Sequence, residues 1–256
     1  MITGNDKCIF ERAGIMDRMV NDNGIRINKF LSDAGVCSRR EADRYIAEGK
    51  VMIDGKPAAL GSRVYLDSKV TFMGKPVGIA GKKVLIAFNK PKGIVCTTDS
   101  RDPDNIIDYI NFPVRIYPIG RLDKDSEGLI LLTNDGSIVN GILRSRYDHE
   151  KEYIVTVNRE ITKEFVKHMS EGVPILGTVT KPCKVTVIGK NTFRIVLTQG
   201  LNRQIRRMCE YLGYRVTRLV RIRIMNITLG DLKTGKWRYV TEDELNELKR
   251  LIRKGR

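Results

Sequence analysis

Apolar residues fall into short runs that predict the strands of a sheet in the C-terminal two thirds of the chain. VLIAFNKP (84–91) and GLILLTN (128–134) are nearly continuous apolar runs, which is typical of strands buried on both faces. KEYIVTV (151–157) and RVTRLVRIRIMNITL (215–229) alternate apolar and polar residues, as half-buried strands do. NTFRIVLT (191–198) predicts a further strand.

Between these strands the apolar residues take the spacing of helices. Three segments have an apolar residue at every third or fourth position: 137–144, 162–172 and 203–213. A fourth helix is expected to begin at a capping sequence at Thr241. Helices and strands are mixed without the regular alternation of βαβ units. The pattern therefore predicts an α+β fold with a mostly antiparallel mixed sheet over residues 84–254.

Residues 25–70 predict a small separate domain. A short helix is followed by a second one, which Ser38 and Glu41 open as a capping box. Asp54-Gly55 then marks a tight hairpin between two short strands, so the order is helix–helix–β. The glycine- and lysine-rich stretch 71–83 is interpreted as a linker. Residues 1–24 lack the apolar core of a secretory signal and are expected to form a poorly ordered extension.

Charge adds information about partners. The chain has 46 basic and 30 acidic residues among 256, and its formal net charge of +16 favours a polyanion such as nucleic acid. A solvated basic surface without a partner is the alternative. The segment from Arg203 to Arg223 contains seven arginines and only one acidic residue, and this clustering favours a binding surface for a polyanion. Five basic residues crowd the N-terminal helices and are expected to contact phosphates with little sequence readout: Arg26, Lys29, Arg39, Arg40 and Arg44.

Several classes of protein are disfavoured. The five cysteines show no CxxC spacing, and the two histidines have no ligand-like neighbour at i+3 or i+4, so neither a disulfide framework nor a zinc site is indicated. No stretch approaches the roughly 20 apolar residues of a membrane span. We therefore expect a reduced, cytoplasmic protein without a metal. Nothing in the sequence calls for a dimer, so a monomer is expected.

The densest chemical signal is GRLDKDSEGLILLTNDG (120–136). A charged, glycine-bounded segment runs directly into an apolar strand, which places Asp123 where a loop meets the sheet. A loop anchored by a rigid strand can hold a reactive carboxylate in a fixed position. A charged surface turn explains the same residues, and this run alone leaves both interpretations open.

The same run resembles the signature of pseudouridine synthases, in particular the branch that modifies small- and large-subunit ribosomal RNA. KPKG (90–93), KEY (151–153) and GLNRQIRRM (200–208) resemble three other motifs of that branch, in the same order. Residues 25–70 are similar to the RNA-binding domain first recognised in a small-subunit ribosomal protein. Within that branch, four stretches are most similar to a member that acts on large-subunit RNA: 148–157, 172–185, 200–216 and 221–227.

The resemblance implies an isomerase that converts a uridine of structured RNA to pseudouridine without a cofactor. It implies that Asp123 is the nucleophile and that Arg206 pairs with it. Tyr153 would stack on the target base near the C5 proton, and Arg121 would fill the space of the flipped nucleotide.

Further contacts to the substrate are expected from basic residues near the site. Lys151 lies on the same strand face as Tyr153 and would pack on its ring. Lys124, Arg203 and Arg207 are candidates for phosphate contacts.

The most probable target by resemblance is the 23S RNA of the large subunit. Two alternatives stay open: the same chemistry on a transfer-RNA stem-loop, alone or in addition, and a non-catalytic RNA-binding or ribosome-assembly factor that retains the fold. A methyltransferase would need a glycine-rich cofactor loop after its first strand, and the sequence has none.

Overall fold

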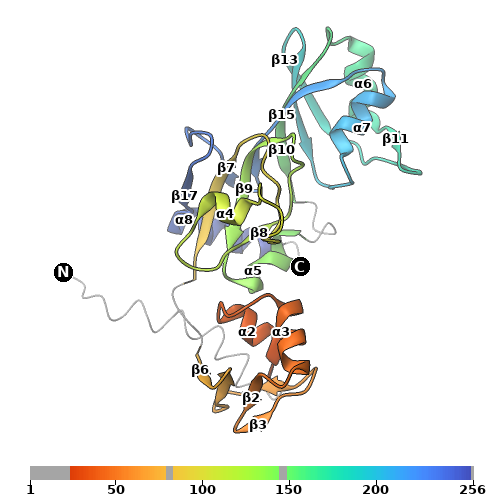
Figure 1. Ribbon diagram of the computed structural model, residues 1–256. Coiled ribbons are helices and arrows are strands. Elements are labelled where there is room, and N and C mark those ends of the chain that lie inside the picture. The colour runs from red at the N-terminus through yellow and green to blue at the C-terminus, as the bar shows by residue number, and fades with distance from the viewer. Residues whose placement is uncertain (1–23, 79–82, 144–148, 255–256) are drawn as a thin grey trace, which may run out of the picture. The chain divides into compact units, whose positions relative to one another are not determined.

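The computed structural model describes residues 24–78, 83–143 and 149–254 (Figure 1). The chain forms two compact units that divide between Lys83 and Val84, where the sequence analysis placed the start of the second domain. The predicted extension, residues 1–24, lies outside the described residues except for Gly24.

The N-terminal unit consists of two helices and small sheets. Its elements are β1 (Ile25–Arg26), α2 (Ile27–Asp33), α3 (Arg39–Ala47), β2 (Val51–Ile53), β3 (Lys56–Pro57), β4 (Arg63–Val64), β5 (Val70–Phe72) and β6 (Lys75–Val77). Helix α3 begins at the predicted capping box, in which the Ser38 hydroxyl accepts from the Glu41 amide and the Glu41 carboxylate accepts from the Ser38 amide. Asp54 and Gly55 form the predicted hairpin turn, both with positive φ.

The interpretation of residues 71–83 as a linker is wrong for its first half. Strand β5 pairs with β2 and β6 pairs with β5, which gives a four-stranded antiparallel sheet in the order β3-β2-β5-β6. The turn between β5 and β6 uses Met73 and Gly74 with positive φ. The sequence did not predict these strands because β6 is an exposed edge strand with hardly any apolar residue to bury.

The C-terminal unit contains a larger sheet and five helices in its described part. Its elements are β7 (Leu85–Lys90), α4 (Ile106–Ile110), β8 (Tyr117–Ile119), β9 (Glu127–Thr133), α5 (Gly136–Leu143), β10 (Lys151–Val157), α6 (Lys163–Glu171), β11 (Pro174–Ile175), β12 (Thr178–Val179), β13 (Lys184–Gly189), β14 (Thr192–Leu197), α7 (Gln204–Tyr211), β15 (Val216–Ile224), β16 (Ile227–Thr228), β17 (Trp237–Tyr239) and α8 (Glu242–Lys254). The predicted strands and helices are present, and the α+β class is confirmed.

The main sheet has the strand order β13-β14-β10-β15-β9-β7-β17, with β8 and β16 paired beside it. Its neighbours are antiparallel except for β15 and β9, which run parallel and pair Val220 with Glu127 and Arg221 with Gly128. This one parallel pair joins the two halves of the sheet. The mostly antiparallel sheet of the prediction is therefore correct.

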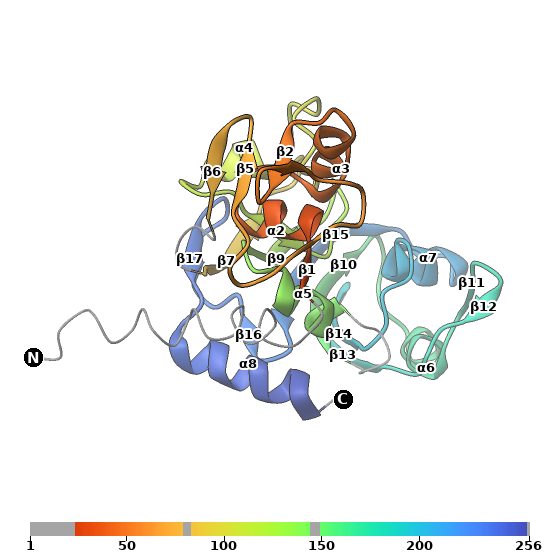
Figure 2. The same ribbon diagram turned by 90° about the horizontal axis from the view of Figure 1, so that it is seen from below.

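Alternate residues of the central strands face two separate apolar layers. On β9, Ile130 and Leu132 pack with α4, whereas Leu129 and Leu131 pack with α5 and α8 on the other face. Figure 2 shows α4 and α8 on opposite sides of β7 and β9. Helices α6 and α7 cover the β10–β14 half. Tyr153 contacts both the α4 layer and the α6–α7 layer, so it lies where the two meet.

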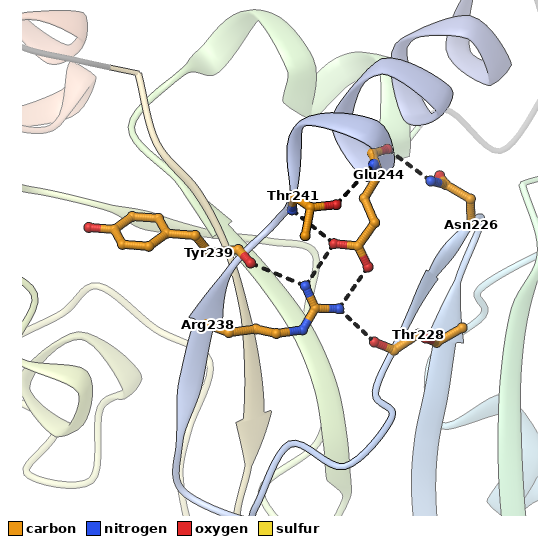
Figure 3. A network of polar contacts seen from close by, with 6 residues as sticks. All are labelled: Asn226, Thr228, Arg238, Tyr239, Thr241 and Glu244. Atoms are coloured by element: carbon orange, nitrogen blue, oxygen red, sulfur yellow. Dashed lines mark hydrogen bonds and ion pairs between the residues drawn. The ribbon is translucent and has the colours of Figure 1, made fainter. Parts of the chain in front are cut away.

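A polar network fixes the start of α8 against the edge of the sheet (Figure 3). Thr241 and Glu244 form a second capping box, with the Glu244 amide donating to Thr241 Oγ1 and the Thr241 amide donating to Glu244 Oε2. Arg238 of β17 donates to both Glu244 oxygens at 2.7 Å and to the Thr228 carbonyl at 3.2 Å. The hydrogen bond from Arg238 lowers the pKa of Glu244 below its usual value.

Candidate active site

Asp123 lies in a tight turn that enters β9. The preceding residue, Leu122, is buried in the α4 layer, and its amide donates to the Cys96 thiol at 3.4 Å. The amide of Ser126 donates to the Asp123 carbonyl at 3.0 Å and closes the turn. The turn is therefore fixed at both ends, while the Asp123 side chain stays 34% exposed. This is the predicted place of Asp123, where a loop meets the sheet.

A buried lysine supports the turn from β7. Lys90 is completely buried, and its ammonium donates to the carbonyls of Pro91, Ile94 and Lys124 at 2.9, 2.7 and 3.4 Å. The Gly93 amide donates to the same Lys124 carbonyl at 2.9 Å. Burial lowers the pKa of Lys90, and the nearby Asp123 carboxylate partly opposes that effect. The KPKG motif thus holds the backbone directly after Asp123.

The glycine of the SEGLILL run has a steric cause. Gly128 has a φ of +99°, and a Cβ at this position would lie 2.3 Å from the Arg221 carbonyl oxygen. The position therefore excludes any side chain and allows β9 to approach β15 at Arg221. A motif glycine on one strand fixes the position of an arginine on the other.

A cavity of about 280 Å³ opens beside the turn. Six charged or aromatic residues of the C-terminal unit line it: Arg121, Asp123, Lys151, Tyr153, Arg203 and Arg206. All six are candidates predicted from the sequence. Arg221, which was not a predicted site residue, also lines the cavity.

The ion pair of Asp123 differs from the predicted one. Arg203 Nη1 lies 3.6 Å from Asp123 Oδ2, whereas Arg206 donates to the Asp125 carbonyl at 3.1 Å and to Ser126 Oγ at 3.3 Å. Arg203 has a left-handed backbone, with φ 51°, at the start of α7. Arg206 follows in the first turn of that helix and uses its donors on the backbone of the catalytic turn. The predicted pairing of Arg206 with Asp123 is therefore replaced by pairing with Arg203.

Tyr153 and Lys151 form the β10 side of the cavity. Tyr153 is directly opposite Arg221 in the pairing of β10 with β15. Lys151 is half-buried, and its ammonium donates to the His149 carbonyl at 3.3 Å. Burial lowers the pKa of Lys151, and repulsion from Arg221 lowers it further.

Two predicted substrate contacts lie outside the cavity. The Lys124 ammonium pairs with Asp104 at 2.8 Å, which raises the pKa of the lysine. Arg207 donates to the carbonyl and the side chain of Asn202. Neither residue lines the cavity, because a local partner holds each side chain elsewhere.

Arg221 was not among the site residues predicted from the sequence. In the alternating strand β15, Leu219 faces the core, so the residue two positions later faces the same way. Arg221 is only 4% exposed, and its Nε donates to the Leu129 carbonyl at 2.7 Å. Thr217 and Arg223 share this register, so the alternation of β15 did not distinguish Arg221 from a solvent-facing residue.

The five basic residues predicted to contact phosphates in the N-terminal unit differ in whether a carboxylate pairs with them. Arg26, Arg39 and Arg40 are exposed, and no carboxylate among the described residues pairs with them. Lys29 pairs with Asp33, and Arg44 lies 3.7 Å from Glu48. Three of the five predicted phosphate contacts therefore present unpaired charge.

Two findings bear on other kinds of site. In the part of the chain that the structure describes, no helix has the length and apolarity needed to cross a membrane. In the same part, no three side chains of His, Cys, Asp or Glu come close enough to hold a metal ion.

Comparison with known proteins identifies both units. The family model for RNA pseudouridylate synthase matches residues 84–211, and the model for the S4 domain matches residues 25–66. The chain is 56% and 55% identical to the dual-specificity RNA pseudouridine synthases RluF of Salmonella typhi and Escherichia coli K12, each over 91% of this chain and 82% and 81% of the relative.

More distant relatives agree. The ribosomal large subunit pseudouridine synthase B of Bacillus subtilis is 35% identical over 90% of this chain and 98% of the relative. A crystal structure of a pseudouridylate synthase superposes with a TM-score of 0.65 at 27% identity, covering 88% of this chain and all of the other. The chain therefore belongs to the RNA pseudouridine synthases, as a member with an S4 domain at its N-terminal end.

Proposed function

We propose that this enzyme uses Asp123 as the nucleophile and that its target uridine lies in 23S ribosomal RNA of the large subunit. The observation that carries the first part is that Asp123 is the only carboxylate among the described residues lining the cavity. The second part is supported by the similarity to the ribosomal large subunit pseudouridine synthase B of Bacillus subtilis. An RNA target of this kind places the enzyme in the cytoplasm.

The reaction requires little beyond a positioned carboxylate. Uridine and pseudouridine are isomers, so one bond from ribose C1′ to uracil N1 is exchanged for one from C1′ to C5. A carboxylate can attack carbon or accept a proton and can later leave, which suits it to both halves of the exchange. The clamped turn supports this role, because the Lys90 and Ser126 hydrogen bonds fix the backbone on both sides of Asp123.

Two arginines divide the support of Asp123 between them. Arg203 supplies a counter-charge 3.6 Å from the Asp123 carboxylate. Arg206 holds the turn through the Asp125 carbonyl and Ser126 Oγ. We assign electrostatic support to Arg203 and positioning to Arg206.

The base must leave its helix or loop to reach Asp123. Unstacking a base costs a few kcal/mol, and stacking on an aromatic ring offsets part of that cost. Tyr153 lies between the two apolar layers at the cavity, where its ring suits a flipped uracil. The exposed Arg121 at the cavity is assigned to the space that the base leaves.

The target RNA is tested by mapping pseudouridines in total RNA from cells with and without the protein. We expect one site of the large-subunit RNA to disappear in its absence. Loss confined to a transfer RNA would instead make that transfer RNA the target. Loss in both RNAs would mean two substrates, in agreement with the dual specificity that the names of the RluF relatives state. If no site disappears, the interpretation as a non-catalytic binding factor replaces the proposal.

The nucleophile is tested by Asp123→Asn. The variant should lose pseudouridine formation by more than about 10⁴-fold, the scale on which removal of a nucleophile acts, and should keep its RNA affinity. Asp125→Asn is the matched control, because its carboxylate does not line the cavity. Substantial turnover by Asp123→Asn would falsify the assignment.

A further inference from the structure

Arg221 carries a donor that nothing in the structure uses. The guanidinium is almost fully buried, its Nε donates to the Leu129 carbonyl at 2.7 Å, and its Nη2 has no hydrogen-bond partner among the described residues. Leaving a buried charged donor without an acceptor is unfavourable, and such groups point to a missing ligand. Arg221 lines the cavity that holds Asp123.

Lys151 places a second cation in the same cavity. Its ammonium makes one long hydrogen bond, 3.3 Å to the His149 carbonyl. Among the described residues no carboxylate pairs with Lys151 or Arg221, because Asp123 pairs with Arg203. The lowered pKa of Lys151 has Arg221 as its second cause after burial, so the two cations are close enough to repel each other. A bound anion would relieve this repulsion.

We propose that Lys151 and Arg221 bind the uracil ring as an anion after it leaves the ribose, with their N–H groups donating to its carbonyl oxygens. The inference rests on the proposed function, in which Asp123 acts at the ribose. When the C1′–N1 bond breaks, its electron pair leaves on uracil and spreads onto N1 and the ring oxygens. C1′ gains a bond to the Asp123 carboxylate, or C2′ gives up a proton to it. C5 then bonds to C1′ as the bond between C1′ and Asp123 breaks, or as Asp123 returns the proton to C2′. The C5 proton then leaves and N1 takes up a proton.

The depth of the two cations favours the base over a phosphate. Arg221 is directly opposite Tyr153 in the strand pairing, so its donors lie at the level of the ring proposed to stack on the base. Arg121 and Arg203 are exposed at the same cavity, whereas Arg221 is only 4% exposed and lies deeper than a backbone phosphate is expected to reach. The phosphates of a bound nucleotide would lie outside the part of the cavity that holds the base, whereas the detached uracil ring would carry its negative charge within that part, beside Lys151 and Arg221.

The position of Arg221 is also fixed before any substrate binds. Its backbone is held against Gly128, where no Cβ fits, and its Nε is held by Leu129. Donors that are already oriented stabilise a developing charge more effectively than donors that must move. This gives the glycine of the catalytic motif a function in the chemistry through Arg221.

The test separates charge on the base from charge on the backbone. Single-turnover rates at saturating RNA and dissociation constants over a series of salt concentrations are measured for Arg221→Met and Lys151→Met, with Arg218→Met as control. Arg218 is exposed on the same strand and does not line the cavity. We expect each cavity variant to lose about 100-fold or more in rate, with affinity and salt dependence like those of the wild type.

A different result overturns the proposal. If the two residues bind phosphate, affinity should fall, the salt slope should drop by about one per residue, and the saturated rate should stay the same. Rates and affinities equal to wild type also contradict it. Failure of the proposed function is distinguishable, because the wild-type enzyme would then form no pseudouridine in the target RNA.

The pH dependence gives a second readout that a purely structural role would not change. The charged groups at the cavity are Asp123 and Arg121 before β9, Arg203 and Arg206 at the start of α7, and Arg221 on β15. Because the proposal needs the Lys151 cation, the wild-type rate should fall as pH rises through the lowered Lys151 pKa. Lys151→Arg should keep most of the rate and shift this fall to higher pH. If Arg221→Met does not fold, as a thermal melt would reveal, Lys151→Met and this profile decide the question; an unchanged profile contradicts the proposal.

Discussion

Asp123 is paired with Arg203 across 3.6 Å, although the arginine of the sequence motif that resembles its partner is Arg206. Arg206 lies one helical turn later and binds the backbone of the turn that carries Asp123. The two arginines therefore contribute differently, one through charge and one through geometry, and substitutions should separate them.

Arg203→Gln should lower the single-turnover rate by about 10- to 100-fold, because a charge near Asp123, the proposed nucleophile, is lost. Its melting temperature should stay close to wild type, since ion pairs with exposed partners add little stability. Arg206→Gln should lower both the rate and the melting temperature, because the hydrogen bonds from Arg206 to the Asp125 carbonyl and Ser126 Oγ are lost. Calorimetry measures the melting temperature of each variant, and single-turnover assays measure its rate. Equal rates for Arg203→Gln and wild type would remove Arg203 from the mechanism.

Tyr153→Phe should bind RNA as the wild type does and isomerise it more slowly. In the proposed role of Tyr153 the ring can still stack on the base, whereas the hydroxyl that is expected to lie near the C5 proton is lost. Tyr153→Ala should weaken the reaction further, because base–aromatic stacking is worth about 1–3 kcal/mol. Quenched-flow measurement of pseudouridine formation distinguishes the variants. A wild-type rate for the phenylalanine variant would exclude the hydroxyl from proton transfer.

Gly128→Ala should destabilise the catalytic unit by at least about 2 kcal/mol, since it combines strain at positive φ with a clash against backbone. The new Cβ would lie 2.3 Å from the Arg221 carbonyl oxygen. Gly189→Ala is the control, because its Cβ would meet ordinary contacts at 3.6 Å and its φ is not positive. Chemical denaturation of the two variants compares them. A Gly128→Ala protein as stable as the control would contradict the steric account.

Glu244→Gln should destabilise the protein by about 1–2 kcal/mol at neutral pH, because a charge-assisted pair of hydrogen bonds from Arg238 is weakened. The folded-state pKa of Glu244 is lowered, so its contribution is complete above the unfolded value and is lost as pH falls through the folded value. The stability difference between variant and wild type should therefore shrink below about pH 4. Thermal melts from pH 3 to pH 7 measure it; a difference that is independent of pH would exclude this linkage.

The double variant Arg39→Glu, Arg40→Glu should weaken RNA binding in the full-length chain. Both residues are exposed and have no carboxylate partner among the described residues, so each can neutralise a phosphate. Lys29→Gln should have a smaller effect because Lys29 is already paired with Asp33. Fluorescence anisotropy at several salt concentrations should give a shallower salt slope for the double variant. Unchanged affinity would give the N-terminal unit another role.

Local signals allowed much of the fold to be predicted. The capping boxes at Ser38 and Thr241 involve residues three apart, so sequence alone specifies them. Strand β6 and the edge strand β17 were missed because their partners, rather than their own residues, make them strands. Short or exposed edge strands have little apolar pattern of their own to detect.

The sequence allowed the residues of the candidate site to be predicted, but the contacts between their side chains could be predicted less well. The motifs that carry the family resemblance pointed to Asp123, Tyr153 and Arg206, and the cavity brings these residues together. The pairing of Asp123 with Arg203 depends on a left-handed residue at the start of α7, which no spacing rule indicates. Lys124 was assigned to substrate by proximity in sequence, but Asp104, twenty residues away, holds it elsewhere.

The single parallel pairing of β9 with β15 has a consequence for the growing chain on the ribosome. Arg221 and Leu129 are 92 residues apart, and their contact joins the two halves of the sheet around Asp123. Contacts of such separation form late, after local helices and hairpins. A nascent chain that has already exposed Asp123 still lacks the strand that completes the cavity. The cavity is therefore completed only after β15 has been synthesised, when the N-terminal unit has already left the exit tunnel.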